Sequence, residues 1–392
     1  MSLTSAHSEQ LLAKGFSRRQ LGRIAGMFAS GAAALPLFSE FAMAQDAERR
    51  MARANGGGGR RFYGPDYVRI SSNENPMGPS KEGLEALVKV APQSWRYSPN
   101  GEERDLVSTI AEMEGVPEDH IAVFAGSSDP LFRTACAFTS PTASWTMGDP
   151  GYASGAPAFI GSKVVKVPLR ADYSHDVEGM IEKGPDAGVY YVCNPNNPSG
   201  TLTPRKDIEY LLAHKSKDAI VLCDEAYIHF SAKAQPANDL VAAGKDVIVL
   251  RTFSKIYGMA GIRAGFAMGR PDLLAKLRPF GVGFLPVPAV ACATASLKAK
   301  SLVAERRALN KDIRSATFEF LDKKGIKYVP SEANFFMMEV GRPGGEYAKL
   351  MADQKVIIGR VWPAWPTMVR VTVGTAEEMS KFKAAAEKIL AA

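Results

Sequence analysis

A lysine surrounded by hydroxyl groups and glycines follows an apolar stretch near the middle of the sequence. Residues 251–263 read RTFSKIYGMAGIR, so Lys255 comes directly after a predicted strand. A lysine that forms a Schiff base must lie near a carbonyl carbon and titrate low enough to act as a base. The hydroxyls of Thr252 and Ser254 and the cation of Arg263 could bind a phosphate beside it. On its own, a lysine at such a position is more often a solvated surface side chain.

An acidic residue ends the apolar stretch that precedes this one. Residues 221–227 read VLCDEAY, which places Asp224 at the end of a predicted strand. A buried carboxylate there requires a cationic partner or hydrogen bonds. A protonated pyridine nitrogen would be such a partner, and the pair keeps the ring an electron sink. Tyr227 could reach a hydroxyl of the same ring. An aspartate that caps a helix explains the pattern equally well.

Two other polar loops also follow predicted strands. Residues 193–200 read CNPNNPSG, where two Asn-Pro steps predict a rigid turn and Asn197 could bind a phenolate oxygen. Residues 125–129 read AGSSD and precede a helix predicted to begin at Pro130. Free N–H groups at a helix N-terminus bind anions. Tyr152, predicted to open the next helix, could stack on a flat ring. Turn chemistry and a core tyrosine are the plainer interpretations.

The elements that must position these residues alternate in type from about residue 101. Short apolar segments at 121–124, 144–147, 164–167, 189–193, 220–223, 247–251 and 265–268 are predicted strands, with helical stretches between most of them. Such alternation predicts a mostly parallel sheet covered on both faces. Ligands then bind at the carboxyl ends of the strands. After about residue 286, helices at 301–324 and 377–390 and strands at 335–340 and 368–373 predict a smaller α/β domain.

In this order and spacing, the segments resemble the fold-type I pyridoxal-phosphate enzymes, specifically the class I/II aminotransferases of the histidinol-phosphate aminotransferase type. Residues 71–80 (SSNENPMGPS), 332–336 (EANFF) and 369–374 (VRVTVG) are similar to further signatures of that family. The resemblance covers nearly everything from about Val68 to Leu390. It implies an aspartate-aminotransferase-like fold, a seven-stranded large domain, pyridoxal 5'-phosphate as cofactor, and a homodimer with shared active sites. We expect the N-terminal arm and part of the small domain at 65–100, the large domain at 101–285 and the rest of the small domain at 286–392.

The resemblance also implies roles for single residues. Lys255 would hold the cofactor covalently and shuttle a proton, Asp224 would pair with the pyridine nitrogen, and Asn197 and Tyr227 would bind the ring oxygen. Arg370 would grip the substrate α-carboxylate as a bidentate fork. The other implied cofactor-binding residues are Gly126, Ser127, Ser128, Tyr152, Thr252, Ser254, Arg263 and, in the neighbouring subunit's site, Tyr97; the other substrate-binding residues are Asn334, Asn73 and Arg360.

Two stretches depart from the family pattern. The family usually has Gly-Ser-Asp-Glu where residues 126–130 read GSSDP. Residues 359–367 read GRVWPAWPT, in which Arg360 falls where the family places a cation for the substrate's distal phosphate. The neighbouring Trp362 and Trp365 favour an aromatic or bulky apolar side chain instead of histidinol phosphate.

The predicted function is therefore transfer of an amino group between an L-amino acid and a 2-oxo acid. Another pyridoxal-phosphate reaction (decarboxylase, β-lyase, racemase or oxidase) is the nearest alternative. A non-catalytic exported binding protein would not need both the lysine and the acid. An NAD-binding fold is excluded because no G-x-G-x-x-G motif follows an early strand.

The N-terminus has the pattern of an export signal. Residues 17–23 read SRRQLGR, an apolar stretch runs to about Phe41, and residues 42–44 read AMA. This predicts a signal peptide over residues 1–44 that resembles twin-arginine signals and engages the twin-arginine export machinery. Residues 45–64, with four consecutive glycines, are a predicted flexible linker. A basic amphipathic helix is the alternative, and the protein would be cytoplasmic if the signal is not used. Pro36 and Glu40 make the stretch a poor stable membrane anchor.

Composition limits the other possibilities. The chain has 392 residues, 46% of them hydrophobic and 23% charged, which suits two globular domains. The net charge of +7 comes without a dense run of Lys and Arg, so we expect no nucleic-acid partner. The four cysteines form no CxxC pair, so we expect buried thiols and no metal site.

Overall fold

The computed structural model describes residues 64–152, 155–281 and 283–390, together with Glu9, Leu12, Ala13, Ser17 and Arg18. The predicted signal peptide and linker lie outside the described residues, apart from these five positions and Gly64.

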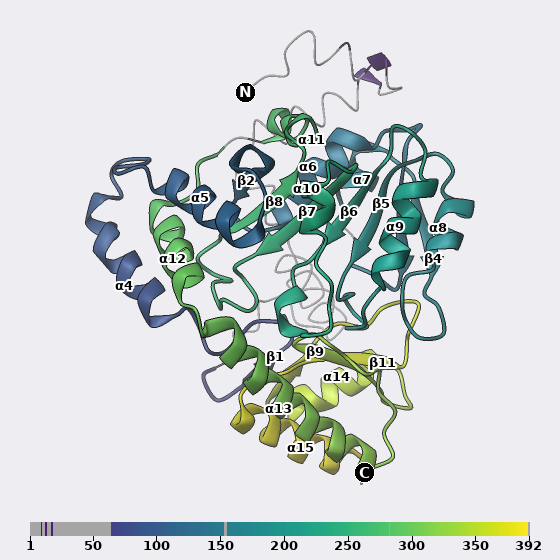
Figure 1. Ribbon diagram of the computed structural model, residues 1–392. Helices are drawn as coiled ribbons and strands as arrows, with labels where there is room; N and C mark the ends of the chain where they lie inside the picture. The colour runs from purple at the N-terminus through teal and green to yellow at the C-terminus, as the bar shows by residue number, and fades with distance from the viewer. Residues whose placement is uncertain are drawn as a thin grey trace.

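A seven-stranded sheet forms the centre of the molecule (Figure 1). Its order is β2-β8-β7-β6-β5-β3-β4, with β8 antiparallel to both of its neighbours and the other pairs parallel. The predicted mostly parallel sheet of seven strands is thus confirmed. The strands are β2 (Ile121–Phe124), β3 (Ser144–Asp149), β4 (Val164–Pro168), β5 (Ala187–Cys193), β6 (Ile220–Asp224), β7 (Val247–Thr252) and β8 (Gly265–Gly269).

The inner strands of the sheet are apolar, as suits a sheet that helices surround. Every residue of β5, β6 and β7 is buried, as expected for parallel strands covered on both faces. Cys193 and Cys223 lie in β5 and β6, and the prediction of four buried thiols is confirmed. The helices are α5 (Glu102–Glu114), α6 (Ser128–Phe138), α7 (Ala156–Ile160), α8 (Val177–Lys183), α9 (Arg205–His214), α10 (Asn238–Ala242), α11 (Pro271–Ala275) and α12 (Val287–Lys298).

The C-terminal elements gather below the sheet in Figure 1 around an apolar cluster of their own. They include a short strand from near the N-terminal end of the described chain, because β1 (Val68–Ile70) pairs in parallel with β10 (Val356–Ile358). An antiparallel pair, β9 (Phe335–Glu339) and β11 (Met368–Thr372), lies beside them. The helices here are α13 (Leu302–Lys323), α14 (Gly344–Asp353) and α15 (Ala376–Leu390). The domain boundaries given above stay a prediction.

A peripheral helix, α4 (Lys81–Val90), packs closely on α12. A Cβ atom on Gly83 would lie 2.5 Å from Ser296 Oγ, so only glycine allows this approach.

No single helix in the described ranges is long and apolar enough to cross a membrane; α12 and α13 pass that test only together, bent by 82°. The short 3-10 helices are η3 (Ala91–Gln93), η4 (Glu118–His120), η5 (Ile228–Phe230) and η6 (Arg278–Phe280).

Two helix starts differ from the prediction. Helix α6 begins at Ser128, so Pro130 lies within its first turn, where a missing N–H costs no hydrogen bond. Helix α7 begins at Ala156, so Tyr152 belongs to the preceding loop and does not open the helix. For α6, a proline that helices tolerate in the first turn was mistaken for the start of the helix.

Candidate active site

The sheet order brings three of the predicted polar segments to one edge. Strands β5, β6 and β7 are neighbours, and Cys193 pairs in register with Asp224. The Asn194–Gly200 turn, Asp224 and the segment after Thr252 therefore leave the carboxyl ends of adjacent strands. This is the edge at which parallel α/β sheets bind ligands.

Lys255 lies three residues beyond β7 and is buried, with 7% of its surface exposed. Its Nζ donates to the backbone oxygen of Ser72 at 3.4 Å. The same atom lies 5.4 Å from the centroid of the Tyr227 ring. The amine is thus held at the carboxyl edge by a segment that is distant in the sequence.

The Tyr227 hydroxyl is contacted by two side-chain amides. It accepts a hydrogen bond from Asn73 Nδ2 at 3.1 Å and one from Asn197 Nδ2 at 3.4 Å. Its ring packs edge-on against Phe335, with centroids 4.8 Å apart. The structure therefore brings the predicted ring-oxygen residues Tyr227 and Asn197 together.

Arg370 lies on β11 and is 2% exposed. It donates from Nη1 to Asn197 Oδ1 at 2.7 Å and from Nη2 to Ser71 O at 2.9 Å. A continuous chain of contacts thus joins Lys255 to Arg370 through Tyr227 and Asn197. A guanidinium with two adjacent nitrogens oriented in this way can bind a carboxylate in a bidentate manner.

Two of the other three predicted substrate residues, Asn73 and Asn334, lie beside Arg370 and Asn197. Asn73 has a φ of 53° and donates from its backbone N–H to Thr372 Oγ1 at 2.9 Å, which ties the N-terminal segment to β11. Asn334 Nδ2 donates to Asn73 O at 3.2 Å. Asn334 Oδ1 is buried and accepts no hydrogen bond from any described residue, so it remains available to a donor on a ligand.

Asp224 is 5% exposed at the end of β6. Its Oδ2 accepts a hydrogen bond from Tyr191 Oη at 2.9 Å, and its Oδ1 accepts one from the backbone N–H of Ala226 at 3.2 Å. Burial, and secondarily the Asp224 charge, raise the pKa of Tyr191 well above its usual value, so Tyr191 acts as a donor. Sequence reasoning missed Tyr191; a tyrosine within an apolar strand, whose hydroxyl requires a partner, was the available signal.

The predicted phosphate-binding residues also converge. Ser127 is the N-cap residue of α6 and Ser128 is its first residue. Arg263 Nη1 donates to Ser254 Oγ at 3.2 Å, and Thr252 Oγ1 donates to the same oxygen at 2.9 Å. Arg263 Nη2 donates to the oxygen of Ala125, the residue before Gly126. The cation, the hydroxyls and the helix N-terminus are therefore close together.

The Arg263 guanidinium has the environment of an anion site. Burial lowers its pKa, and no carboxylate of the described residues lies within 4.0 Å of it. Gly126 has a φ of 92°, and a Cβ atom there would lie 2.3 Å from Arg263 Nη2. A buried cation without a carboxylate, hydroxyls and helix N–H groups form a suitable donor set for a phosphate. With an amine at Lys255 and a buried acid at Asp224, these residues fit pyridoxal phosphate.

Trp362 lies next to the Arg370 guanidinium, and we call it and the nearby Trp365 the aromatic wall. The Trp362 ring centroid is 5.3 Å from Arg370 Cζ and 4.5 Å from Arg360 Cζ. Arg360 Cζ is also 6.0 Å from the centroid of the Tyr152 ring. Trp362 Nε1 donates to Gly151 O at 3.3 Å. The predicted residues Tyr152 and Arg360 thus lie together beside Trp362.

Tyr97 lies apart from this cluster in its own chain. Its side chain is 76% exposed and packs on the ring of Phe284, itself 70% exposed, with centroids 4.8 Å apart. In the part of the chain that the structure describes, Tyr97 makes no hydrogen bond to the residues around Lys255.

Residues 65–389 match the family model for class I and II aminotransferases. This chain belongs to that family. It is 32% identical over 338 residues to histidinol-phosphate aminotransferase of Moorella thermoacetica, a match that covers 83% of this chain and 86% of the relative.

Solved structures agree with the family. Histidinol-phosphate aminotransferase from Sinorhizobium meliloti in complex with pyridoxal-5'-phosphate superposes with a TM-score of 0.74 at 25% identity, over 88% of this chain and 94% of that chain. Aspartate aminotransferase from Thermus thermophilus shares the fold alone, with a TM-score of 0.73 at 20% identity, over 88% of this chain and 95% of that one. The predicted fold class is confirmed, and the aminotransferase is a pyridoxal-phosphate-dependent transaminase that acts on an amino acid and a 2-oxo acid.

Proposed function

We propose that the contact chain from Lys255 to Arg370 is the catalytic centre. When bound, pyridoxal phosphate would supply the carbonyl carbon for Lys255 and a ring that withdraws electrons from the substrate. Arg263, Ser254, Thr252, Ser127, Ser128 and the backbone at Gly126 would hold its phosphate; Asp224, Asn197 and Tyr227 would hold its ring, with Tyr152 stacked on it.

Within this frame, Arg370 would fix the α-carboxylate of the amino acid, assisted by Asn334 and Asn73. With the carboxylate fixed, the Cα–H bond can be turned toward Lys255 Nζ. The amine then removes the Cα proton and later returns a proton. The single observation that supports this arrangement is the unbroken path of contacts Lys255–Tyr227–Asn197–Arg370, which brings the proposed base and the proposed carboxylate-binding residue into one cluster.

We propose further that the amino donor carries an aromatic or bulky apolar side chain. The Trp362 ring lies 5.3 Å from Arg370 Cζ, so a side chain next to the gripped carboxylate would meet an aromatic surface. Val329 and Met337 pack behind that ring, and Tyr173, Trp365 and Met368 border it. Apolar contact at this wall would favour large side chains over small ones.

The test is a donor panel. We would purify residues 45–392, load them with pyridoxal phosphate, and record absorption spectra as single L-amino acids are added. Conversion of the cofactor to its amino form by phenylalanine, tyrosine or leucine, with release of the 2-oxo acid, supports both parts of the proposal. Histidinol phosphate, which has no carboxylate, is added to the same panel; efficient conversion by it alone would contradict the substrate class and the α-carboxylate role of Arg370, but not the role of Lys255.

We propose that the functional unit is a homodimer in which Tyr97 completes the partner's phosphate site. Support comes from the exposure of the neighbouring aromatic side chains Trp95, Tyr97 and Phe284. Large apolar side chains exposed side by side are typical of surfaces that a partner covers.

We propose that residues 1–44 direct export through the twin-arginine machinery. The paired Arg18 and Arg19, the apolar stretch and the AMA sequence at 42–44 support this. The test compares the full chain with a variant carrying Arg18→Lys and Arg19→Lys by cell fractionation. Loss of the periplasmic pool in the variant is the expected result; an unchanged cytoplasmic location for both chains would contradict the proposal.

A further inference from the structure

A tight loop between β4 and α8 touches the aromatic wall from outside the site. At its tip, the Tyr173 ring meets the Trp365 ring edge-on, with centroids 5.6 Å apart and an interplanar angle of 89°. Trp365 in turn donates its backbone N–H to Trp362 O at 2.9 Å. Tyr173 is therefore connected, through Trp365, to the ring that lies beside Arg370.

Tyr173 is held in a backbone conformation that large side chains rarely adopt. Its φ is 65°, in the left-handed region, so the surroundings must stabilise it. Tyr173 N donates to Arg170 O at 2.9 Å, and Arg170 N donates to Ser174 O at 2.9 Å. The Tyr173 carbonyl accepts a hydrogen bond from Thr201 Oγ1 at 2.7 Å. Both sides of Tyr173 are thus anchored.

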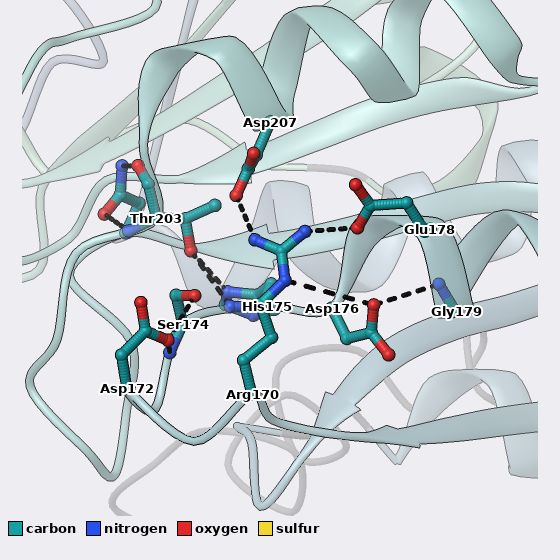
Figure 2. Close-up of polar contacts among 10 residues, drawn as sticks. Arg170, Asp172, Ser174, His175, Asp176, Glu178, Gly179, Thr203 and Asp207 are labelled. Carbon is teal, nitrogen blue, oxygen red and sulfur yellow. Dashed lines mark hydrogen bonds and ion pairs between the residues drawn. The ribbon is translucent and has the colours of Figure 1, made fainter.

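Arg170, which accepts the hydrogen bond from Tyr173 N, is itself held by carboxylates around its guanidinium (Figure 2). Arg170 donates from Nη1 to Asp207 of α9 and from Nη2 to Glu178 of α8, and its Nε lies 4.0 Å from Asp176 Oδ1. Three carboxylates, from α8, from its N-cap residue Asp176 and from α9, hold one guanidinium. The loop that presents Tyr173 is therefore attached firmly to the large sheet.

Other contacts of the aromatic wall with this part of the molecule come from the same segment of the chain. Segment 359–367 comes from the C-terminal part of the chain and contains two prolines. Besides the Tyr152–Arg360 contact, it meets loops of the large sheet through Trp362 Nε1, at Gly151 O, and through the Trp365 ring, at Tyr173. Without the Tyr173 ring, the contact with the Trp365 ring is lost.

We propose that Tyr173 is a positioning residue that sets which amino acid side chains the enzyme accepts, by holding Trp365 and thereby Trp362 against the substrate. This inference rests on the proposed preference for bulky donors. Tyr173 itself does not touch the Lys255 amine or the Arg370 guanidinium. It acts on Trp362 through Trp365. Its loss should therefore affect large donors, which use the wall, much more than small donors, which do not.

The test uses the cofactor-loaded dimeric enzyme and the variants Tyr173→Gly and Tyr173→Phe. Glycine removes the ring and tolerates a φ of 65°, so the loop keeps its conformation. Phenylalanine keeps the ring. Tyr210→Ala is the matched control, because Tyr210 is a half-buried tyrosine of α9 that stacks on His214. We would measure kcat and KM for phenylalanine and alanine, and Kd for 3-phenylpropionate, which lacks an amino group.

For Tyr173→Gly we expect KM for phenylalanine and Kd for 3-phenylpropionate to rise about tenfold, while KM for alanine stays within about twofold. Tyr173→Phe and Tyr210→Ala should behave as the unmodified enzyme, and the cofactor spectrum should be unchanged throughout. An unchanged preference for phenylalanine in Tyr173→Gly, or an equal loss for both donors, would overturn the role of Tyr173 but not the proposed substrate class. An unmodified enzyme without any preference for phenylalanine overturns the proposed substrate class and this role with it.

Discussion

At the scale of single residues, the candidate site depends on one amine whose direction is set by its neighbours. Lys255 Nζ is held between Ser72 O and the Tyr227 ring. Lys255→Ala should abolish the absorption band of covalently attached cofactor and lower transamination by at least about a thousandfold, since both attachment and proton transfer need the amine. Lys245→Ala, at an exposed position, is the control. Retained covalent attachment in Lys255→Ala would show that another lysine carries the cofactor.

Arg370 should determine how tightly the amino acid binds. Arg370→Lys keeps the charge but loses the planar fork, and its single ammonium cannot replace both Nη1–Asn197 and Nη2–Ser71 contacts. We expect KM for the amino donor to rise by roughly 10- to 100-fold with a smaller change in kcat. Steady-state kinetics measure this. A lower kcat at unchanged KM would mean that Arg370 does not bind the substrate ground state.

The combination of polar segments, and the family resemblance that they carry, predicted much of this cluster. Lys255, Asp224 and Asn197 drew attention because each lies at or just after the end of an apolar strand, where a polar side chain needs a chemical reason. The backbone oxygens of Ser71 and Ser72, which hold Arg370 and Lys255, could not be predicted, because a carbonyl has no sequence signature. The roles of these residues stay predictions; the structure contributes their proximity.

At the scale of elements, the turn between β2 and α6 is proposed to hold the cofactor phosphate close to the backbone. Gly126→Ala would place a Cβ atom 2.3 Å from Arg263 Nη2 and displace the guanidinium. We expect the Kd for pyridoxal phosphate to rise about tenfold or more through loss of a charge-assisted contact. Gly115→Ala is a matched control, because Gly115 also has a positive φ but its Cβ would meet nothing within 4 Å. Equal cofactor affinities in the two variants would contradict the assignment of the Gly126 turn to the phosphate site.

The loop that carries Tyr173 should make stability depend on pH. His175 is buried and contacts Thr203 Oγ1 through Nδ1 at 2.7 Å (Figure 2). Burial, and secondarily the Arg170 charge, lower the pKa of His175 from 6.5 to about 4. The unfolded chain therefore binds the proton first as pH falls, so this stability is complete above about pH 6.5 and is lost as the pH falls toward 4.

His175→Asn should reduce that pH dependence. Between pH 7 and pH 5, the free energy of unfolding should fall by about 2 kcal/mol less in this variant than in the unmodified protein. Urea denaturation at both pH values measures the difference. His214→Asn, at an exposed histidine, is the control. An identical fall in both proteins would mean that His175 is not the group that titrates.

Regular elements were predictable where their periodicity was strong. All seven strands of the sheet were placed within two residues, because their apolar runs are short and bounded by polar turns. Helix α12 was missed: its residues are mostly apolar on several faces, so no helical period distinguishes it. Strand β1 was missed because three residues of a long-range parallel pair have no local pattern. Both are fixed by tertiary packing.

At the scale of the whole molecule, the proposed dimer predicts that two defective chains can repair each other. Tyr97 is exposed in its own chain and is proposed to reach the partner's phosphate, while Lys255 acts in its own subunit. In a dimer of Lys255→Ala with Tyr97→Ala, one site then has both defects and the other has none. The unfolded variants, mixed in equal amounts and refolded, should assemble randomly, so roughly half of the dimers would be mixed.

Because each mixed dimer has one intact site of two, the mixture should recover roughly a quarter of the unmodified activity. Each variant refolded alone should stay near its own low value, and Tyr97→Phe should behave like Tyr97→Ala if the hydroxyl is the contact. Sedimentation velocity on the same samples would establish that the refolded protein is dimeric. Activity equal to the mean of the two separate variants, in a preparation that is dimeric, would show that each subunit completes its site alone, and Tyr97 would then be only a surface residue.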